Sequence, residues 1–314
     1  MDREELELFE KSLRHATATA SGAALDAALA ELGWADALTT DPRAAVSLLF
    51  ELQGGAATTS GALDLVLADA LGLAPGAGVV LPPLRSWQPP AEWVGEEVRI
   101  AGLGLPDLAS GATAVAVASD GGAITIDINH LAGRELRGLD PHLGLVEVTA
   151  ALPRATTRST PSTAWEDAIV AGQRALAHEL VGATRAMLEL ARTHALERVQ
   201  FGRPIAGFQA VRHRLADALV AAESASAALD AAWDDPSPFT ASLAKAVAGR
   251  SARTVARHCQ QVLAGIGFTA DHPFHHYLRR ILVLDALLGD ARSLTKSLGE
   301  QLLQTRQLPA ILPL

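Results

Sequence analysis

The sequence predicts a mainly α-helical protein with a small β region in its middle, and three observations lead to this fold class. Apolar residues make up 49% of the 314 residues, and only 7 Phe, 5 Trp and 1 Tyr are aromatic, so Ala, Leu and Val dominate and favour helix over sheet. Both ends of the chain carry apolar residues at helical spacing. Between them, short β-rich runs alternate with Gly and Pro.

Residues 1–73 are expected to form an N-terminal helical domain. Apolar residues recur at helical spacing in 6–13 and again in 23–32. Asp41 and Pro42 open a further helix, which ends at the following glycine pair, and the stretch 60–71 predicts another helix.

Residues 74–160 are expected to form a reduced middle β domain. The β-rich runs lie at 98–100, 113–118, 123–128 and 143–148. Gly121 and Gly122 separate two of these runs and predict a two-residue hairpin turn. The polar segment 154–163 predicts a linker to the last domain.

Residues 161–314 predict a C-terminal four-helix bundle. Thr163 and Glu166 fit a capping box at the start of a long first helix. A second helix is expected from Phe208 to the DDPSP segment, and the third and fourth at about 240–263 and 273–304. The tail LPAILPL is apolar and interrupted by proline, which indicates packing against a partner chain.

Composition and charge argue against several functional classes. Lys and Arg total 26 against 35 Asp and Glu, and this net charge of −9 disfavours nucleic acid as a partner. The single cysteine, Cys259, excludes a disulfide framework and a cysteine-based zinc site. The acidic amino terminus lacks the basic start of a secretory signal, and no apolar run is long enough to predict a membrane span. The expected compartment is therefore the cytoplasm.

Two predicted loops carry residues that suit a dinucleotide. In the first, between the first two bundle helices, Arg198 offers a planar fork for a pyrophosphate and Phe201 offers an aromatic face for a purine. In the second, after the third bundle helix, Gly265 and Gly267 allow the backbone to approach a ligand closely. Taken by themselves, the same residues also fit an ordinary helix connection and a glycine helix stop.

The histidine-rich segment DHPFHH at 271–276 is interpreted differently. Its histidines are adjacent or separated by proline, and adjacent side chains on a helix point apart. We therefore expect the amino-terminal turn of a helix rather than a metal site.

Together, the two loops resemble the acyl-CoA dehydrogenase family over residues 164–305. The family's first motif, R-x-x-F-G-x-x-(I)-x-x-F-Q, is matched by Arg198, Phe201, Gly202, Ile205, Phe208 and Gln209. Its second motif, Q-x-x-G-G-x-G-(F/Y), is matched by Gln261, Ala264, Gly265, Gly267 and Phe268, with one glycine replaced by alanine.

The resemblance implies FAD held across a subunit interface. If the roles of the family's motif residues apply to this sequence, Arg198 would contact the pyrophosphate of a neighbouring subunit's FAD. Phe201 would contact the dinucleotide of the same FAD. Gln209 would bond nearby, and Gln261 with Gly265 would line the adenosine end. The layout of helices, β domain and bundle also fits the family.

The family's reaction requires a carboxylate base beside the thioester, and the resemblance places its two known base positions on Leu288 and Gly172. Neither residue can accept a proton, so no catalytic residue is assigned. The family's T-E-x-x-x-G-S-D and W-(I)-(T/S)-x-G segments, which hold flavin and substrate, are also not found.

The leading hypothesis is a non-catalytic, FAD-supporting subunit that resembles those of actinobacterial α2β2 steroid side-chain acyl-CoA dehydrogenases. The implied partners are a homologous catalytic subunit, a steroid side-chain acyl-CoA, and an electron-transfer flavoprotein or similar acceptor. The chain alone is expected to be inactive. Three alternatives are a complete homotetramer with a displaced base such as Asp285 or Glu179, a flavin-free scaffold, and a related flavoprotein of another reaction type.

Overall fold

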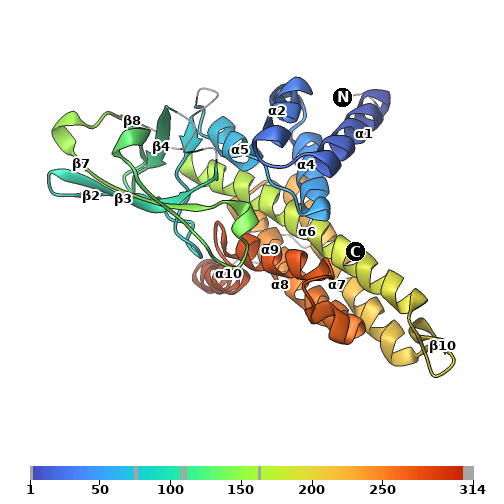
Figure 1. The fold of residues 1–314 in the computed structure, drawn as a ribbon. Coiled ribbons are helices and arrows are strands. Elements are labelled where there is room, and N and C mark those ends of the chain that lie inside the picture. Colours follow the sequence, from blue (N-terminus) through green and yellow to red (C-terminus); the bar gives the residue numbers. More distant parts are fainter. Residues whose placement is uncertain (1–2, 74–76, 107, 109–111, 162–163, 307–314) are drawn as a thin grey trace.

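The structure, a computed structural model, describes residues 3–73, 77–106, 108, 112–161 and 164–306. N-terminal helices and a β region flank the first part of a long helix, and the rest of the helical bundle extends away from them (Figure 1). The predicted mainly helical fold with a small β region is confirmed. No helix among the described residues combines the length and the apolarity needed to cross a membrane.

Five helices form the N-terminal part of the chain. They are α1 (Arg3–Thr19), α2 (Ala23–Glu31), α3 (Trp34–Thr40), α4 (Pro42–Ala56) and α5 (Ala62–Ala70). The Asp41 side chain caps α4 by accepting a hydrogen bond from the Ala44 amide at 3.1 Å, with Pro42 at the first helical position. The helices predicted from spacing and capping are confirmed, whereas the short α3 was not foreseen.

Helix α4 lies against the first bundle helix, α6 (Trp165–Glu197), at two glycines. A Cβ atom on Gly54 would lie 2.0 Å from the Glu179 carbonyl oxygen, and one on Gly182 would lie 2.0 Å from the Glu51 carbonyl oxygen. The two backbones therefore approach within a distance that no larger residue permits. This crossing joins the N-terminal helices to the bundle.

Two four-stranded sheets make up the β region. One sheet contains β1 (Gly78–Val79), β4 (Thr113–Val117), β5 (Gly122–Asp127) and β8 (Ser159–Pro161) in that order. The other has the order β2 (Ala91–Val94), β3 (Glu97–Gly104), β7 (Val146–Pro153) and β6 (Ala132–Glu135). All pairs are antiparallel except β1 with β4. Val80, Ile100 and Ile124 lie in a small apolar core that both sheets share.

Two predictions in the β region need correction. The hairpin between β4 and β5 exists, but its loop is longer than two residues, because Gly121 donates to the Ala118 carbonyl and Ala118 donates to that of Gly122. Gly121 takes the positive φ of 85° that this longer turn requires. The expected polar linker at 154–163 is also wrong in part, because Ser159–Pro161 pair with β5 as strand β8.

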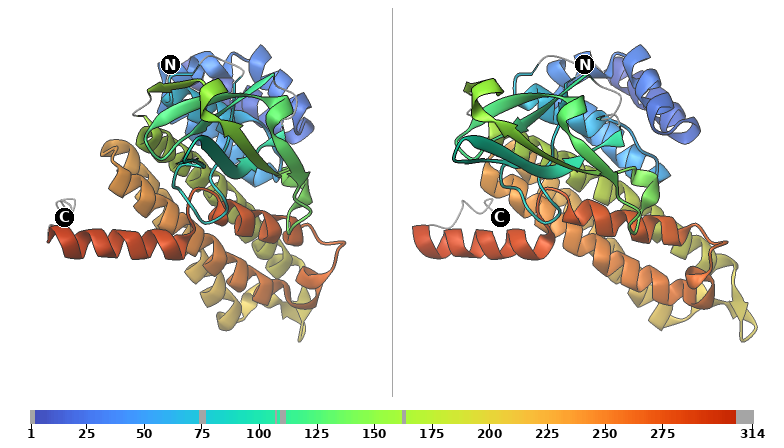
Figure 2. Two further views of the ribbon diagram at one scale, coloured as in Figure 1. Left: turned by 90° about the vertical axis from the view of Figure 1, so that its left-hand side faces the viewer. Right: turned by 60° about the vertical axis from the view of Figure 1, so that its left-hand side comes forward.

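Three long helices and two shorter ones form the bundle. After α6 come α7 (Gln209–Asp234), α8 (Pro238–Leu263), α9 (Phe274–Ala286) and α10 (Ala291–Thr305). The predicted break at DDPSP is confirmed, and Ser237 with Thr240 forms a capping box at the start of α8. The expected cap at Thr163 and the apolar tail lie outside the described residues. In Figure 2, α10 projects away from the rest of the bundle.

The predicted fourth bundle helix at 273–304 is in fact two helices, α9 and α10. Helix α9 ends at Ala286, where Leu287 turns extended, and Leu288 and Gly289 follow with left-handed φ values of 52° and 96°. Asp290 then starts α10 by accepting hydrogen bonds from the amides of Arg292 and Ser293. The spacing of apolar residues could not reveal the break between α9 and α10, because the apolar pattern continues across it.

A buried ionic cluster lies where the three parts of the chain meet. The Arg280 guanidinium in α9 contacts the carboxylate of Asp140 and, at 3.4 Å, that of Glu179 in α6. It also donates to the carbonyl of Thr58 at 2.6 Å, just beyond α4. Arg280, Asp140 and Glu179 are almost entirely removed from solvent.

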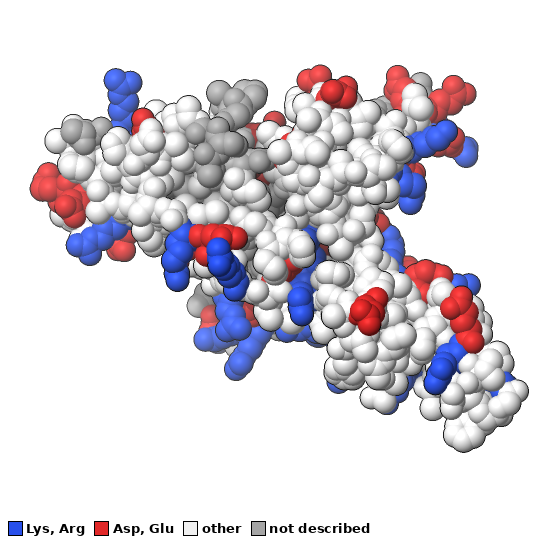
Figure 3. All heavy atoms as spheres, viewed as in Figure 1, with Lys and Arg blue, Asp and Glu red and all other residues white. Residues whose placement is uncertain are grey.

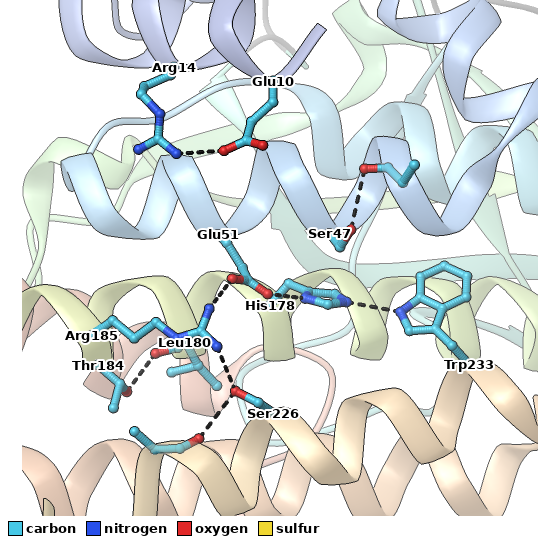
Figure 4. Close-up of polar contacts among 12 residues, drawn as sticks. Glu10, Arg14, Ser47, Glu51, His178, Leu180, Thr184, Arg185, Ser226 and Trp233 are labelled. Carbon is cyan, nitrogen blue, oxygen red and sulfur yellow. Dashed lines mark hydrogen bonds and ion pairs between the residues drawn. The ribbon is translucent and has the colours of Figure 1, made fainter. Parts of the chain in front are cut away.

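A second polar network ties α4, α6 and α7 together (Figure 4). The Trp233 indole N–H donates to His178 Nε2 at 2.9 Å, and this assigns the histidine proton to Nδ1. His178 Nδ1 then donates to Glu51 at 3.0 Å, and Arg185 bridges Glu51 and Ser226. Each of the three helices therefore contributes at least one member of the network.

Replacing Arg280 tests the ionic cluster. Arg280→Met leaves Asp140 and Glu179 buried without their cation, and we expect the free energy of unfolding to fall by about 3–5 kcal/mol. Urea unfolding followed by circular dichroism measures the change. Arg43→Met is the matched control, because its pairs with Asp230 and Asp234 are exposed and worth about 0–1 kcal/mol. Equal losses in both variants would contradict this role of the cluster.

Candidate functional site

The two predicted loops lie at the same end of the bundle. Helices α6, α7 and α8 pack side by side with short connections, so α6 and α8 run in the same direction and end together. We call this end, residues 198–208 and 264–268, the tip (Figure 1, near β10). Burial, and after it the charge of the nearby His272, lowers the pKa of His194, so the end of α6 lies close to the segment that follows the second loop.

The first tip loop is a tight hairpin that presents an aromatic ring to solvent. Strands β9 (Val199–Gln200) and β10 (Arg203–Pro204) pair, and the turn places Phe201 and Gly202 at φ values of 52° and 76°. Positive φ is unusual for a phenylalanine and reflects the demands of the turn. The Phe201 side chain is 91% exposed and meets Phe208 edge-on at 6.0 Å. This exposure leaves its face open to a ligand.

Arginines surround this ring. The Arg203 guanidinium stacks on Phe208 at 4.2 Å, and Arg212 donates to the carbonyl of Ala206 at 2.8 Å. Arg198 is exposed, and within the described residues none of these three arginines has an ion pair with a carboxylate. Unpaired guanidinium groups beside an aromatic ring fit an anionic, aromatic ligand such as a dinucleotide.

The second tip loop is open as well. Gln261 is exposed in the last turn of α8, and a Cβ atom on Gly265 would meet nothing within 4 Å. The turn η6 (Ala264–Phe268) leaves Phe268 79% exposed. Sequence reasoning did not single out Phe268 as a ligand contact, although it lies in the second motif.

All five predicted cofactor-binding residues therefore lie exposed at or beside the tip. They are Arg198, Phe201, Gln209, Gln261 and Gly265. Their binding roles remain predictions. The histidine-rich segment forms the expected helix start, where His272 Nδ1 accepts the amide of Phe274 at 3.2 Å.

The two predicted base positions, Gly172 and Leu288, lie against each other in the structure. A Cβ atom on Gly172 would be 2.5 Å from Leu288 Cδ1 and 2.9 Å from Leu67 Cδ2. Leu288 is 1% exposed, and the Trp87 ring lies against the neighbouring Gly289. Apolar side chains therefore enclose both predicted base positions.

Both candidates for a displaced base are already bonded. Asp285 accepts from Arg253 at 2.7 and 2.9 Å and from the amide of Ala291 at 3.0 Å. Burial raises the pKa of Glu179, and the nearby positive charge of Arg280 opposes that rise. A base must be free to reach its proton, and these contacts hold both carboxylates in place.

The cavity beside the base positions is small. It measures about 220 Å³, and its walls include Trp87, Trp165 and Ile169. Gln173 closes it by donating to the Leu288 carbonyl at 2.9 Å and accepting from Ser242 at 3.0 Å. Ligand pockets generally occupy about 300–1,000 Å³, so this space is below the usual range for a substrate.

Lys245 in α8 forms hydrogen bonds with the backbone around the segment between α9 and α10. Its buried ammonium donates to the carbonyls of Asp285 and Gly289 at 3.0 and 3.2 Å, on either side of Leu288. Burial lowers the pKa of Lys245 to about 8. The lysine therefore fixes the backbone on both sides of Leu288, a predicted base position.

Residues 168–303 match the family model described as acyl-CoA dehydrogenase, C-terminal domain. The chain is 36% identical to acyl-CoA dehydrogenase IpdE2 of Mycobacterium tuberculosis over 126 residues, which cover 40% of each protein. It is 41% identical to acyl-CoA dehydrogenase FadE34 of the same organism over 152 residues, 44% of this chain and 21% of that protein. The chain thus spans less than half the length of these curated relatives.

Solved structures match nearly the whole chain at low identity. The Tcur3481–Tcur3483 steroid ACAD gives a TM-score of 0.79 at 23% identity, covering 96% of this chain and 99% of that one. The ChsE4–ChsE5 complex from Mycobacterium tuberculosis gives 0.77 at 19% identity, with 99% of each chain covered. A glutaryl-CoA dehydrogenase from Mycobacterium smegmatis in complex with FADH2 gives 0.71 at 14% identity, with 98% and 97% covered. At these identities the likeness shows a shared fold.

The buried lysine predicts a pH dependence of stability. The unfolded chain keeps a lysine pKa of about 10.4, so between pH 8 and that value it binds more protons than the folded chain. The Lys245 contribution to the free energy of unfolding should therefore rise as pH rises through this window. Urea unfolding of the wild type and of Lys245→Met, at neutral pH and near pH 9.5, measures it. A difference between the two proteins that does not change with pH would count against the assignment.

Proposed function

Because residues 168–303 are an acyl-CoA dehydrogenase C-terminal domain and the chain has the fold of that family, we propose that this protein is a subunit of a FAD-dependent acyl-CoA dehydrogenase. In this proposal it supplies part of an interfacial FAD site but no catalytic base. The proposal rests on two observations. The tip exposes arginines and aromatic rings to solvent, whereas apolar side chains fill the space around the predicted base positions.

The tip fits the dinucleotide half of FAD. Arg198 is available to bond the pyrophosphate, and the exposed Phe201 ring is available to pack on the ligand. Gln209 begins α7 beside the hairpin, while Gln261 and the open backbone at Gly265 suit the adenosine end. Because these residues project from the molecule, the FAD they contact belongs to a site completed by another subunit.

The chemistry of the reaction then divides between two chains. Dehydrogenation of an acyl-CoA removes a proton from the carbon next to the thioester carbonyl and a hydride from the following carbon, which FAD accepts when it is bound. Leu288 and Gly172 cannot take the proton, so the partner must supply the carboxylate. We therefore infer that this chain alone is inactive.

The partner we propose is a homologous catalytic subunit in an α2β2 assembly. The ChsE4–ChsE5 complex and the Tcur3481–Tcur3483 steroid ACAD, each named for two components, support such a pairing. We propose a steroid side-chain acyl-CoA as the substrate, and the Tcur3481–Tcur3483 protein, which is a steroid ACAD, supports this choice. An electron-transfer flavoprotein or similar acceptor would reoxidise the flavin, and the proposed compartment is the cytoplasm.

The alternatives have less support. A complete homotetramer needs a mobile base, whereas Asp285 and Glu179 are held by Arg253 and Arg280. A flavin-free scaffold leaves unexplained why the Phe201 ring is exposed to solvent beside arginines that have no ion pair among the described residues.

Arg198→Ala should lower the flavin content of the assembled complex. Losing a charge-assisted contact to pyrophosphate is worth about 1.5–3 kcal/mol, which corresponds to roughly tenfold to a hundredfold weaker FAD binding. Absorbance of FAD after gel filtration of the complex measures retention. Arg192→Ala is the matched control, because this exposed α6 arginine pairs with Glu189 instead. Wild-type flavin content in Arg198→Ala would sink the assignment.

Leu288→Glu should not make the isolated chain active. The new carboxylate would lie buried against Gly172, with Leu67 and Trp87 packed on the neighbouring residues, which leaves no room for an acyl group. Turnover of acyl-CoA esters with an artificial electron acceptor measures the result, and Leu288→Gln controls for the change in shape. Glutamate-dependent turnover by the chain alone would show that it contains a complete site.

A further inference from the structure

Four histidines gather at the start of α9. His272, His275 and His276 lie in its first turn or just before it, and His142 belongs to the facing turn η3 (Pro141–Leu143) of the β region. The ring centroid of His276 lies 3.9 Å from that of His275 and 5.9 Å from that of His142. A crevice of about 310 Å³ opens beside His142 and His276, which are both exposed to solvent. We call these four residues the histidine cluster.

Two of the histidines support the helix start only in their neutral form. His272 Nδ1 accepts the amide of Phe274 at 3.2 Å, one of the amides that a helix start leaves free. A protonated imidazole carries hydrogen on both nitrogens and cannot accept this bond. His275 Nε2 donates to the Ala270 carbonyl at 3.0 Å, and its buried Nδ1 has no hydrogen-bond partner among the described residues. A second proton on His275 would therefore find no acceptor.

The surroundings of the histidine cluster disfavour positive charge. The N-terminal end of a helix carries a partial positive charge, and three of the four histidines lie there. Burial, and after it the charge of His275, lowers the pKa of His272. Burial also lowers the pKa of His276, and the neighbouring histidines and Arg279 add to this effect.

Little negative charge is available to offset protons on the histidine cluster. Asp140 favours a charge on His276, but it already pairs with Arg280. Lys and Arg side chains reach the surface where Figure 1 labels α9 (Figure 3). The other groups near the cluster are His194, Glu197 and Arg198 at the end of α6, Asp271 before α9, Tyr277 and Arg279 in α9, and the uncharged Ala56 and Ala57 at the end of α4. Glu197 and Asp271 are exposed, so solvent screens their charge.

We propose that the histidine cluster makes the start of α9 sensitive to acid. While the histidines are neutral, the Phe274 amide keeps its acceptor and η3 packs against α9. Protonation removes that acceptor and places like charges on His142 and His276, so the first turn of α9 and η3 separate more easily. The second tip loop directly precedes this turn in the chain, so acidification also weakens its support.

The direction of the effect follows from proton uptake. Histidine in the unfolded chain has a pKa of about 6.5, whereas the pKa values of His272 and His276 are lower in the folded chain. Between these values the unfolded chain binds more protons, so the free energy of unfolding falls as pH falls. The stabilisation by the histidine cluster is therefore present above about pH 6.5 and is lost on acidification.

Hydrogen–deuterium exchange of the full chain near pH 7.5 and near pH 5.5, corrected for the intrinsic exchange rate at each pH, tests the proposal. On acidification, amides in the first turn of α9 should lose protection about fivefold, as for a lost helix cap. His272→Asn should prevent much of this loss, because the asparagine oxygen accepts the Phe274 amide without titrating. His15→Asn is the matched control at an exposed histidine of α1 and should respond to acid as the wild type does.

A second variant tests the repulsion between η3 and α9. In His142→Gln, titration by nuclear magnetic resonance should show the pKa of His276 raised by about 0.5, because a positive charge with its ring centroid 5.9 Å away is removed. An unchanged His276 pKa would overturn the proposal. Equal protection of α9 at the two pH values, or the same acid response in His272→Asn as in the wild type, would also overturn it. None of these measurements needs flavin, so their outcome is independent of the proposed FAD site.

Discussion

The buried guanidinium of Arg280 is the interaction on which the arrangement of the chain depends. It brings the carboxylates of Glu179 and Asp140 and the carbonyl of Thr58 to one point, and these come from the bundle, the β region and the N-terminal helices. A charge buried without its partners is costly, so all three parts must dock together for the cluster to form. The cluster also holds α9, which sets where the following residues lie.

The position of α9 sets the packing around the predicted base positions. With α9 fixed and Lys245 donating to the carbonyls of Asp285 and Gly289, Leu288 packs against Gly172, and the Trp87 ring lies against Gly289. The result is a well-packed apolar contact at the two predicted base positions. At the other end of the bundle, by contrast, Phe201 and Phe268 remain unpacked. Apolar side chains that are exposed in this way indicate a surface that binds a partner or a ligand.

Much of the fold was predictable, because its signals are local. The cap at Asp41, the DDPSP break and the helical spacing depend on neighbouring residues alone. The split between α9 and α10 was not predictable in this way, since apolar residues continue through Leu288 and only its backbone changes. Strand β8 was missed for a similar reason: a polar segment becomes a strand only because β5 offers it an edge.

In the candidate site, too, the features that depend on neighbouring residues could be predicted, and those that depend on distant residues could not. Its motif residues were found from their chemistry and spacing, but the contact between Gly172 and Leu288 joins positions far apart in sequence. The most direct test of the account is the flavin content of the chain, purified alone and again with its homologous catalytic partner. We predict a colourless chain and a yellow complex. A yellow isolated chain that retains stoichiometric FAD would contradict the shared site.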